Sequence, residues 1–174
     1  SARISENSYL MTTTTAAASS VMRHLDFVHQ AYLPELNVKF VSVTEQWAQF
    51  AVSGPKSVDI ISSVMDGHFN EKDWPFMSCG EVKVVGIKAR LFRISFSGEL
   101  GFELAIPSRF GSSLFSVLKF EAEQRGGGVY GMEAMNVLRM EKGFITHAEI
   151  DGRATAYDVG MQKMISEKKD FIGN

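Results

Sequence analysis

Apolar residues recur at the spacing of an α-helix in four segments of the chain. Pro34 ends the first segment, Ser53-Gly54-Pro55 is a start signal for the second, Ser108 can cap the third, and Gly143 ends the fourth. The pattern predicts helices over 16–33, 55–65, 108–125 and 131–142. The residues expected to face the core from the second and third helices are Val58, Ile61, Met65, Phe110, Leu114, Val117, Leu118 and Glu121 or Ala122.

Alternating apolar and polar residues between these segments predict β-strands. The strands are expected over 8–13, 38–43, 47–53 and 101–107, with a hairpin over 81–96 that turns at Gly86. The resulting order, β-α-β-β-α-β-β-β-α-α, indicates an α+β fold with mostly antiparallel sheets flanked by helices. In the last strands Phe92, Ile94, Phe96, Phe102, Leu104 and Ile106 are expected on one face, and Arg93, Ser95, Ser97, Glu103 and Ala105 on the other.

Composition and charge narrow the class of protein. Hydrophobic residues make up 45% and charged residues 22% of the 174 residues, and the net charge is −2, which does not favour a nucleic-acid partner. The single cysteine, Cys79, excludes an internal disulfide and fits a reducing compartment. Because the chain lacks a membrane-length apolar run and its first residues lack the apolar centre of a signal peptide, we expect a cytoplasmic location and no membrane partner.

Common catalytic and metal motifs are missing from the sequence. The glycines of "RGGGVYG" follow a predicted helix, whereas a phosphate-binding loop follows a strand. His24 and His29 share a helix at a spacing that does not suit a metal-ligand pair, so we expect no metal site. No Gly-x-Ser-x-Gly elbow is present, which argues against a serine hydrolase.

The stretch "SGELG" places one carboxylate, Glu99, between Gly98 and Gly101. A carboxylate offers two acceptor oxygens side by side, and these match a flat heterocycle, such as a pterin, that presents an N–H beside an NH2 group. The glycines would let the backbone turn sharply and let a ring approach. The alternative is a hairpin turn that carries an exposed glutamate.

Two further features have a functional and a structural interpretation. Arg139 lies on an otherwise apolar helix, where it could bind a ligand carboxylate or pair with an internal acid, and the internal pair is the favoured interpretation. The loop "DGHFNEKDWPFMSCG" is long, and exposed Trp74, Phe76 and Met77 would suit contact with a partner subunit.

Two segments, "ISFSGELGFELAIP" and "YGMEAMNVLRMEKGFITHAEIDGRAT", resemble the folate-binding aminomethyltransferase family, typified by the T protein of the glycine cleavage system. Within that family, "SVTEQWAQFAVSGPKS", "WPFMSCG", "EKGFITHAEIDGRAT" and "MTTTT" are most similar to the C-terminal region of the α subunits of heterotetrameric sarcosine oxidases. The likeness extends over nearly the whole chain, so residues 1–174 are expected to form one aminomethyltransferase-like domain.

The resemblance implies a function for this region. It would bind tetrahydrofolate, which captures the one-carbon unit from oxidative demethylation of sarcosine as 5,10-methylenetetrahydrofolate. Glu99 would anchor the pterin, Thr12, Thr13 and Thr14 would lie near it, and Arg139 would contact the ligand. A flavin on a neighbouring subunit and NAD elsewhere in the complex would complete the oxidase. The alternative is a non-catalytic folate-binding or subunit-interface module on the same fold.

The sequence also departs from the family pattern. The T proteins carry a catalytic aspartate shortly before the first matched strand, so that residue is expected upstream of residue 1, and Asp151 and Asp158 cannot take its place. Met135 stands where many T proteins have an arginine, and Phe144 replaces the cysteine of the Lys-Gly-Cys signature found in folate-dependent iron–sulfur repair proteins. Because both ends lack closing elements, we expect a fragment truncated at both ends that is inactive alone.

Overall fold

A computed structural model describes residues 1–170 of the chain. It contains each of the predicted helices, whose ends differ from the expected ones by at most three residues. Gly143 closes the last of them in the left-handed conformation, with φ +80°. No helix within residues 1–170 is long and apolar enough to cross a membrane. The helices are α1 (Ala18–Tyr32), α2 (Ser57–Val64), α3 (Gly111–Gln124) and α4 (Met132–Lys142), with short helical turns at Thr15–Ala17, Thr44–Gln46, Glu71–Asp73, Ser108–Phe110 and Gln162–Met164.

The strands form two antiparallel sheets, which confirms the α+β fold class. The larger sheet has four strands in the order β3-β6-β5-β4. Its β3 and β6 pair along their whole length, from Trp47 opposite Pro107 to Ser53 opposite Gly101. A separate ribbon joins β1 to β2. The strand bounds are β1 Ala2–Ser5, β2 Ser8–Leu10, β3 Trp47–Ser53, β4 Cys79–Val84, β5 Ile87–Phe92 and β6 Gly101–Pro107.

Three strand predictions were wrong in detail, and one strand was missed. The strand expected over 8–13 ends at Leu10. The stretch 38–43 has no regular structure, although its residues alternate, because no strand among the described residues pairs with it. Strand β1 was not predicted, since four residues of mixed polarity carry little periodic signal. Strand β5 ends at Phe92, so Ile94 and Phe96 lie in the following loop, and Phe96 is 41% exposed.

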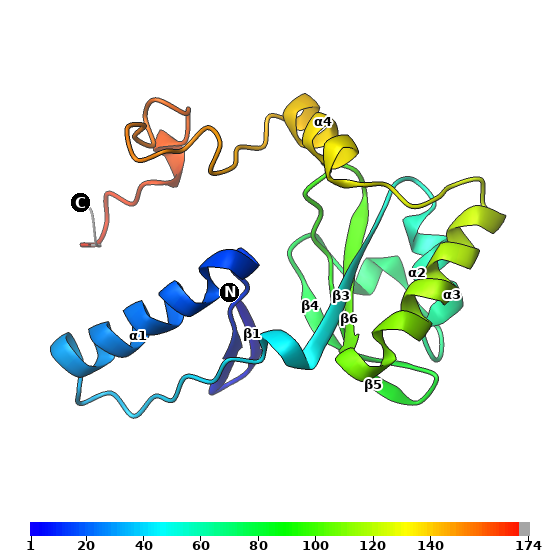
Figure 1. The fold of residues 1–174 in the computed structure, drawn as a ribbon, viewed down its shortest axis with the longest axis horizontal. Helices are drawn as coiled ribbons and strands as arrows, with labels where there is room; N and C mark the ends of the chain where they lie inside the picture. Colours follow the sequence, from blue (N-terminus) through cyan, green and yellow to red (C-terminus); the bar gives the residue numbers. More distant parts are fainter. Residues whose placement is uncertain (171–174) are drawn as a thin grey trace. The chain divides into compact units, whose positions relative to one another are not determined.

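Helices α2 and α3 cover one face of the four-stranded sheet (Figure 1). The core lies between them and that face, where fully burying each large apolar side chain contributes about 1.5–3 kcal/mol. Val58 was expected to be buried but packs only at the edge of the core, and Ile60 is buried in its place. Val117 was also expected to be buried but is 47% exposed. The buried cluster consists of Val52, Ile60, Ile61, Val64, Phe69, Val84, Ala89, Leu91, Phe102, Leu104, Ile106, Leu114 and Leu118.

The β4–β5 hairpin turns at Val85 and Gly86, as the position of Gly86 predicted. Both residues have positive φ angles, +50° and +75°, and a β-branched residue in this conformation is a strained outlier. The carboxylate of Asp66, at the end of α2, accepts the N–H of Val85 at 2.7 Å and that of Gly86 at 2.6 Å. One side chain therefore satisfies both turn donors and ties the hairpin to α2.

The described chain divides into two compact units. The first comprises residues 1–95 and 99–130, and the second combines 96–98 with the segment that begins at Gly131. The expectation of one domain over 1–174 stays a prediction. The argument for truncation at the C-terminal end falls partly on residues 171–174, which lie outside the described residues.

Candidate functional site

The loop between β5 and β6 contains the "SGELG" motif, and its glycines stand where larger residues do not fit. Gly98 has φ +81°, and a Cβ atom there would lie 2.6 Å from the Cβ of Lys142. A Cβ on Gly101 would lie 2.9 Å from the hydroxyl oxygen of Ser53 and 3.0 Å from the Cβ of Ser95. Close packing therefore requires glycine at both positions, and at Gly98 the backbone conformation requires it as well.

The start of α2 fixes the backbone just after Glu99. The N–H of Gly54 donates to the carbonyl of Leu100 at 2.8 Å, and the hydroxyl of Ser57 donates to the same oxygen at 3.1 Å. Ser57 is 1% exposed, so this second bond is sheltered from water. The Ser53-Gly54-Pro55 signal thus begins a helix and also holds the motif loop in place.

Glu99 itself is exposed on this loop. Its assignment as the pterin anchor stays a prediction. The threonines proposed to lie near the pterin occupy the segment between β2 and α1, within the same compact unit. There the hydroxyl of Thr13 donates to the carbonyl of Thr14 at 3.1 Å, and that carbonyl accepts the N–H of Ala17 at 2.9 Å. Thr12 and Thr14 are exposed, and Thr13 is half-buried.

The second acid of the motif, Glu103, lies on β6 and faces away from α2 and α3. The side-chain amide of Gln49 on β3 donates a hydrogen bond to its carboxylate. Burial raises the pKa of the Glu103 carboxyl above its usual range, and the Gln49 bond partly offsets this effect. Sequence reasoning treated Glu103 only as an outward strand position. The structure makes it a half-buried acceptor on the face of the sheet opposite α2 and α3.

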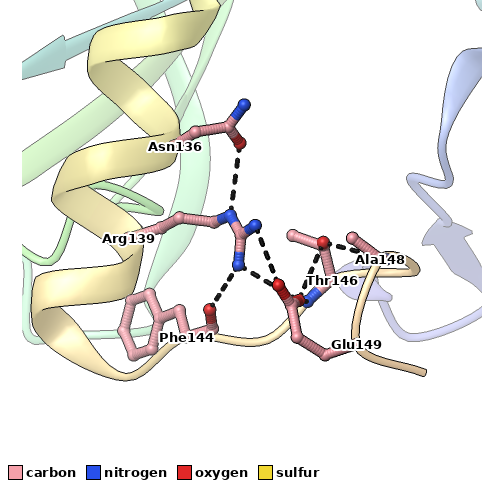
Figure 2. Close-up of polar contacts among 6 residues, drawn as sticks. All are labelled: Asn136, Arg139, Phe144, Thr146, Ala148 and Glu149. Carbon is pink, nitrogen blue, oxygen red and sulfur yellow. Dashed lines mark hydrogen bonds and ion pairs between the residues drawn. The ribbon is translucent and has the colours of Figure 1, made fainter.

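Arg139 is buried, with 5% of its surface exposed, and its guanidinium binds other groups of the second unit (Figure 2). Both of its terminal nitrogens donate to the carboxylate of Glu149 at 3.1 Å. Its Nε donates to Asn136 Oδ1 at 3.2 Å, and Nη1 also donates to the carbonyl of Phe144 at 3.0 Å. The internal-pair interpretation is confirmed. Contact with a ligand stays a prediction, and it would have to compete with these bonds.

Glu149 is the acidic residue that sequence analysis missed. The N–H and hydroxyl of Thr146 donate to it at 2.7 Å and 3.0 Å (Figure 2). These bonds, led by the Thr146 N–H and followed by Arg139, lower the pKa of the Glu149 carboxyl to about 2. The Thr-x-x-Glu spacing of a capping box was the available signal.

The two downstream aspartates bind local partners. Asp151 pairs with Arg153, and Asp158 accepts the N–H of Thr155 at 2.8 Å and its hydroxyl at 2.7 Å. These hydrogen bonds hold the pKa of both carboxyls below the usual range. Both acids thus organise turns after α4.

The loop between α2 and β4 presents two of the three apolar residues expected at an interface. Phe76 and Met77 are 71% and 69% exposed. Trp74 was wrongly expected to be exposed, because its ring stacks on Phe69 at 6.3 Å between centroids and packs against Gly80, where a Cβ would come within 3.1 Å.

Arg93 holds this loop in shape. Its guanidinium donates to the carbonyl of Trp74 at 2.7 Å and pairs with Glu71 at 2.8 Å. Its carbonyl accepts the N–H of Met77, which has φ +69°. The exposed side chains of Phe76 and Met77 therefore lie on a turn that the bonds of Arg93 hold in place.

Comparisons with known proteins place the chain in a family. The family model described as "GCVT N-terminal domain" matches residues 1–169. "Sarcosine oxidase subunit alpha" of Rhizobium meliloti (strain 1021) is 44% identical over 174 residues, which cover 98% of this chain and 18% of that protein. The protein of the same name from Corynebacterium sp. (strain P-1) is 42% identical, with the same coverage.

A more distant relative is "Aminomethyltransferase" of Thermoanaerobacter sp. (strain X514), 26% identical over 138 residues, which cover 78% of this chain and 37% of that protein. The chain spans only 18% of the length of the two sarcosine oxidase relatives. Since the family model covers almost all of the sequence and the motif residues lie within it, the chain belongs to the GCVT family as an aminomethyltransferase-like N-terminal domain.

Proposed function

We propose that this chain is the folate-binding region of a sarcosine-oxidase-type α subunit. Bound tetrahydrofolate would capture the one-carbon unit released from sarcosine and carry it away as 5,10-methylenetetrahydrofolate. The family membership and the names of the two α-subunit relatives support this proposal. The flavin would reside on a partner subunit and NAD elsewhere in the complex, so the isolated chain would bind folate without turning over sarcosine.

The observation that carries the proposal is a pair of carboxylates in one motif, Glu99 in the loop and Glu103 on the strand that follows it. Each offers the paired acceptors that a pterin edge requires. Glu103 is the more sheltered of the two, and a hydrogen bond is stronger where water is excluded. A fixed pterin would hold its N5 for attack on the one-carbon unit, so the gain would come from proximity and orientation.

Calorimetric titration with folinic acid, a stable reduced folate, tests the proposal and separates the two carboxylates. Glu99→Gln and Glu103→Gln each keep one acceptor but place an NH2 group against the donors of the pterin. We expect the variant at the anchoring position to bind about 10- to 100-fold more weakly. Glu123→Gln, which removes an exposed acid on α3, is the matched control.

The results distinguish the possible outcomes. A loss in Glu99→Gln alone would establish the loop anchor, and a loss in Glu103→Gln alone would move the anchor to the strand. Failure of the unaltered chain to bind folinic acid, or equal binding by all variants, would refute this site.

A second candidate function is a subunit-interface module, which the braced pair Phe76 and Met77 favours. Aromatic residues and methionine are enriched at protein interfaces. Co-purification with the flavin-carrying subunit, using Phe76→Ser and Met77→Ser beside the exposed-valine control Val117→Ser, tests it. Loss of the subunit in the first two variants alone would support an interface, and unchanged recovery would oppose one.

A further inference from the structure

Arg90 on β5 and Trp47 on β3 meet across the intervening strand β6. Arg90 stands opposite Ala105 of β6, and Trp47 stands opposite Pro107. The guanidinium carbon of Arg90 lies 4.0 Å from the centroid of the Trp47 ring, a close cation–π contact. Ala105 faces away from the helices yet is only 2% exposed, which agrees with the two large side chains closing over it.

Within residues 1–170, Arg90 has no ion pair with an acid, although a half-buried guanidinium usually has such a partner. Its Nε is buried without a hydrogen-bond partner within residues 1–170. Glu81 stands directly opposite on β4, but the part of the chain that the structure describes shows no ion pair between them. A buried N–H without an acceptor is unfavourable, so the described part of the chain does not satisfy all the donors of this guanidinium.

The shape of the pair suits a planar anion. A guanidinium that lies over an aromatic ring can still donate from the terminal N–H groups at its edge. A carboxylate matches that edge through two parallel hydrogen bonds. Gln49, opposite Ala105 on the other side, and Glu103, two residues before Ala105, supply polar neighbours on the same face.

We propose that Arg90, which lies over the Trp47 ring, binds the carboxylate of a small-molecule ligand on the face of the sheet opposite α2 and α3. The carboxylate site rests on this geometry alone. Two sources share its chemistry, the glutamate tail of a folate and the carboxylate of an amino-acid substrate. The first would deepen the proposed function and rests on it, whereas the second does not require folate.

Nuclear magnetic resonance of the indole N–H groups gives a local readout, because the chain has two tryptophans. Trp47 reports on the proposed site, and Trp74, which packs in the core, is the internal reference. A Trp47→Phe variant assigns the signals. The probes are folinic acid, p-aminobenzoylglutamate, a reduced pterin without the glutamate tail, and sarcosine.

We expect a carboxylate ligand to shift the Trp47 signal and leave Trp74 unchanged. Arg90→Gln should weaken its binding about 10-fold, and Lys88→Gln, which removes the same charge from an exposed position two residues away on β5, should change it less than about two-fold. If the folate tail is the ligand, p-aminobenzoylglutamate shifts the Trp47 signal, and the pterin without the tail binds the unaltered chain and Arg90→Gln equally. If the amino acid is the ligand, sarcosine shifts the Trp47 signal.

Equal effects of Arg90→Gln and Lys88→Gln, or no Trp47-specific shift with any carboxylate probe, would overturn the proposal. Arg90→Lys, which keeps the charge but lacks the planar fork, covers the case in which the glutamine variant does not fold, and it should also bind more weakly. The folinic acid titration of the Glu99 and Glu103 variants is independent of this result. A failure of the carboxylate site therefore leaves the pterin site to be judged by its own data.

Discussion

Arg139 and Glu149 face each other as a forked pair, with each terminal nitrogen of the guanidinium 3.1 Å from one carboxylate oxygen (Figure 2). The pair joins the last turn of α4 to the segment that follows it. Arg139 is 6% exposed at its side chain and Glu149 is 39% exposed, so the cation is buried and the anion reaches it from the surface. We therefore expect this pair to contribute to how the second compact unit responds to acid and to mutation.

Acid should weaken the second unit through Glu149. Its carboxyl pKa falls from 4.5 to about 2 on folding, so the charged form is favoured in the folded state. The stabilisation is fully present above about pH 4.5, declines as the pH falls, and is lost near pH 2. We expect the melting temperature of the unaltered chain to exceed that of Glu149→Gln at pH 6, and the two to converge as the pH approaches 2.

Titration of the Glu149 side-chain carbon by nuclear magnetic resonance measures the same quantity directly. An apparent pKa near 4.5 would contradict the prediction.

Removal of the Arg139 guanidinium should destabilise the chain without necessarily affecting ligand binding. Arg139→Gln removes the guanidinium that donates to Glu149 and to the Phe144 carbonyl, and we expect a loss of about 2 kcal/mol in the free energy of unfolding. Urea unfolding followed by circular dichroism measures it. Arg153→Gln, which breaks an exposed pair nearby, is the control and should change stability much less than Arg139→Gln does.

The folinic acid affinity of folded Arg139→Gln then decides the ligand role of Arg139. Affinity equal to that of the unaltered chain would leave Arg139 with a structural role only.

The hairpin turn should be sensitive to Asp66 and improvable at Val85. Asp66→Ala removes the acceptor of both turn N–H groups, and we expect a loss of about 1–2 kcal/mol in unfolding free energy. Val85→Asn places a residue that tolerates positive φ at a position with φ +50°, and we expect a gain of about 1 kcal/mol. Thermal unfolding measures both changes, and a destabilised Val85→Asn would show that the exposed valine makes a contact of its own.

Alanine at Gly98 should cost more than alanine at another glycine of similar conformation. Gly98 and Gly126 have φ +81° and +76°, but only at Gly98 does an added Cβ meet an atom, the Cβ of Lys142 at 2.6 Å. We expect Gly126→Ala to lose about 1 kcal/mol from strain and Gly98→Ala about 2–3 kcal/mol from strain and overlap. Equal losses in urea unfolding would show that the loop moves away from α4 without cost.

The helices and most strands of the larger sheet followed from local pattern. A buried stripe or an alternating face repeats within one segment, so the periods at α2, α3 and β6 were visible without a partner. The stretch 38–43 shows the limit of that reasoning. Its residues alternate as a strand would, but whether a segment becomes a strand depends on a neighbour to pair with, and none of the described strands pairs with it.

In the candidate site, too, some features could be predicted from the sequence and others depended on the fold. The motif around Glu99 and the pairing of Arg139 with an internal acid could be predicted, because each prediction depends on residue type and on near neighbours in the sequence. Trp74 was misjudged because its burial depends on Gly80 and Phe69, which only folding brings beside it.

By itself, the sequence determined the helical segments, the hairpin and the family motif, and it indicated that Arg139 needs an acidic partner. Only the tertiary structure decided that Glu149 is this partner, that Glu103 is half-buried beside Gln49, and that the Arg90 guanidinium lies over the Trp47 ring. The physical reason is that strand order and register are set by pairing between distant segments. A pattern along one strand shows which residues share a face, but it does not show which residues of other strands lie beside them.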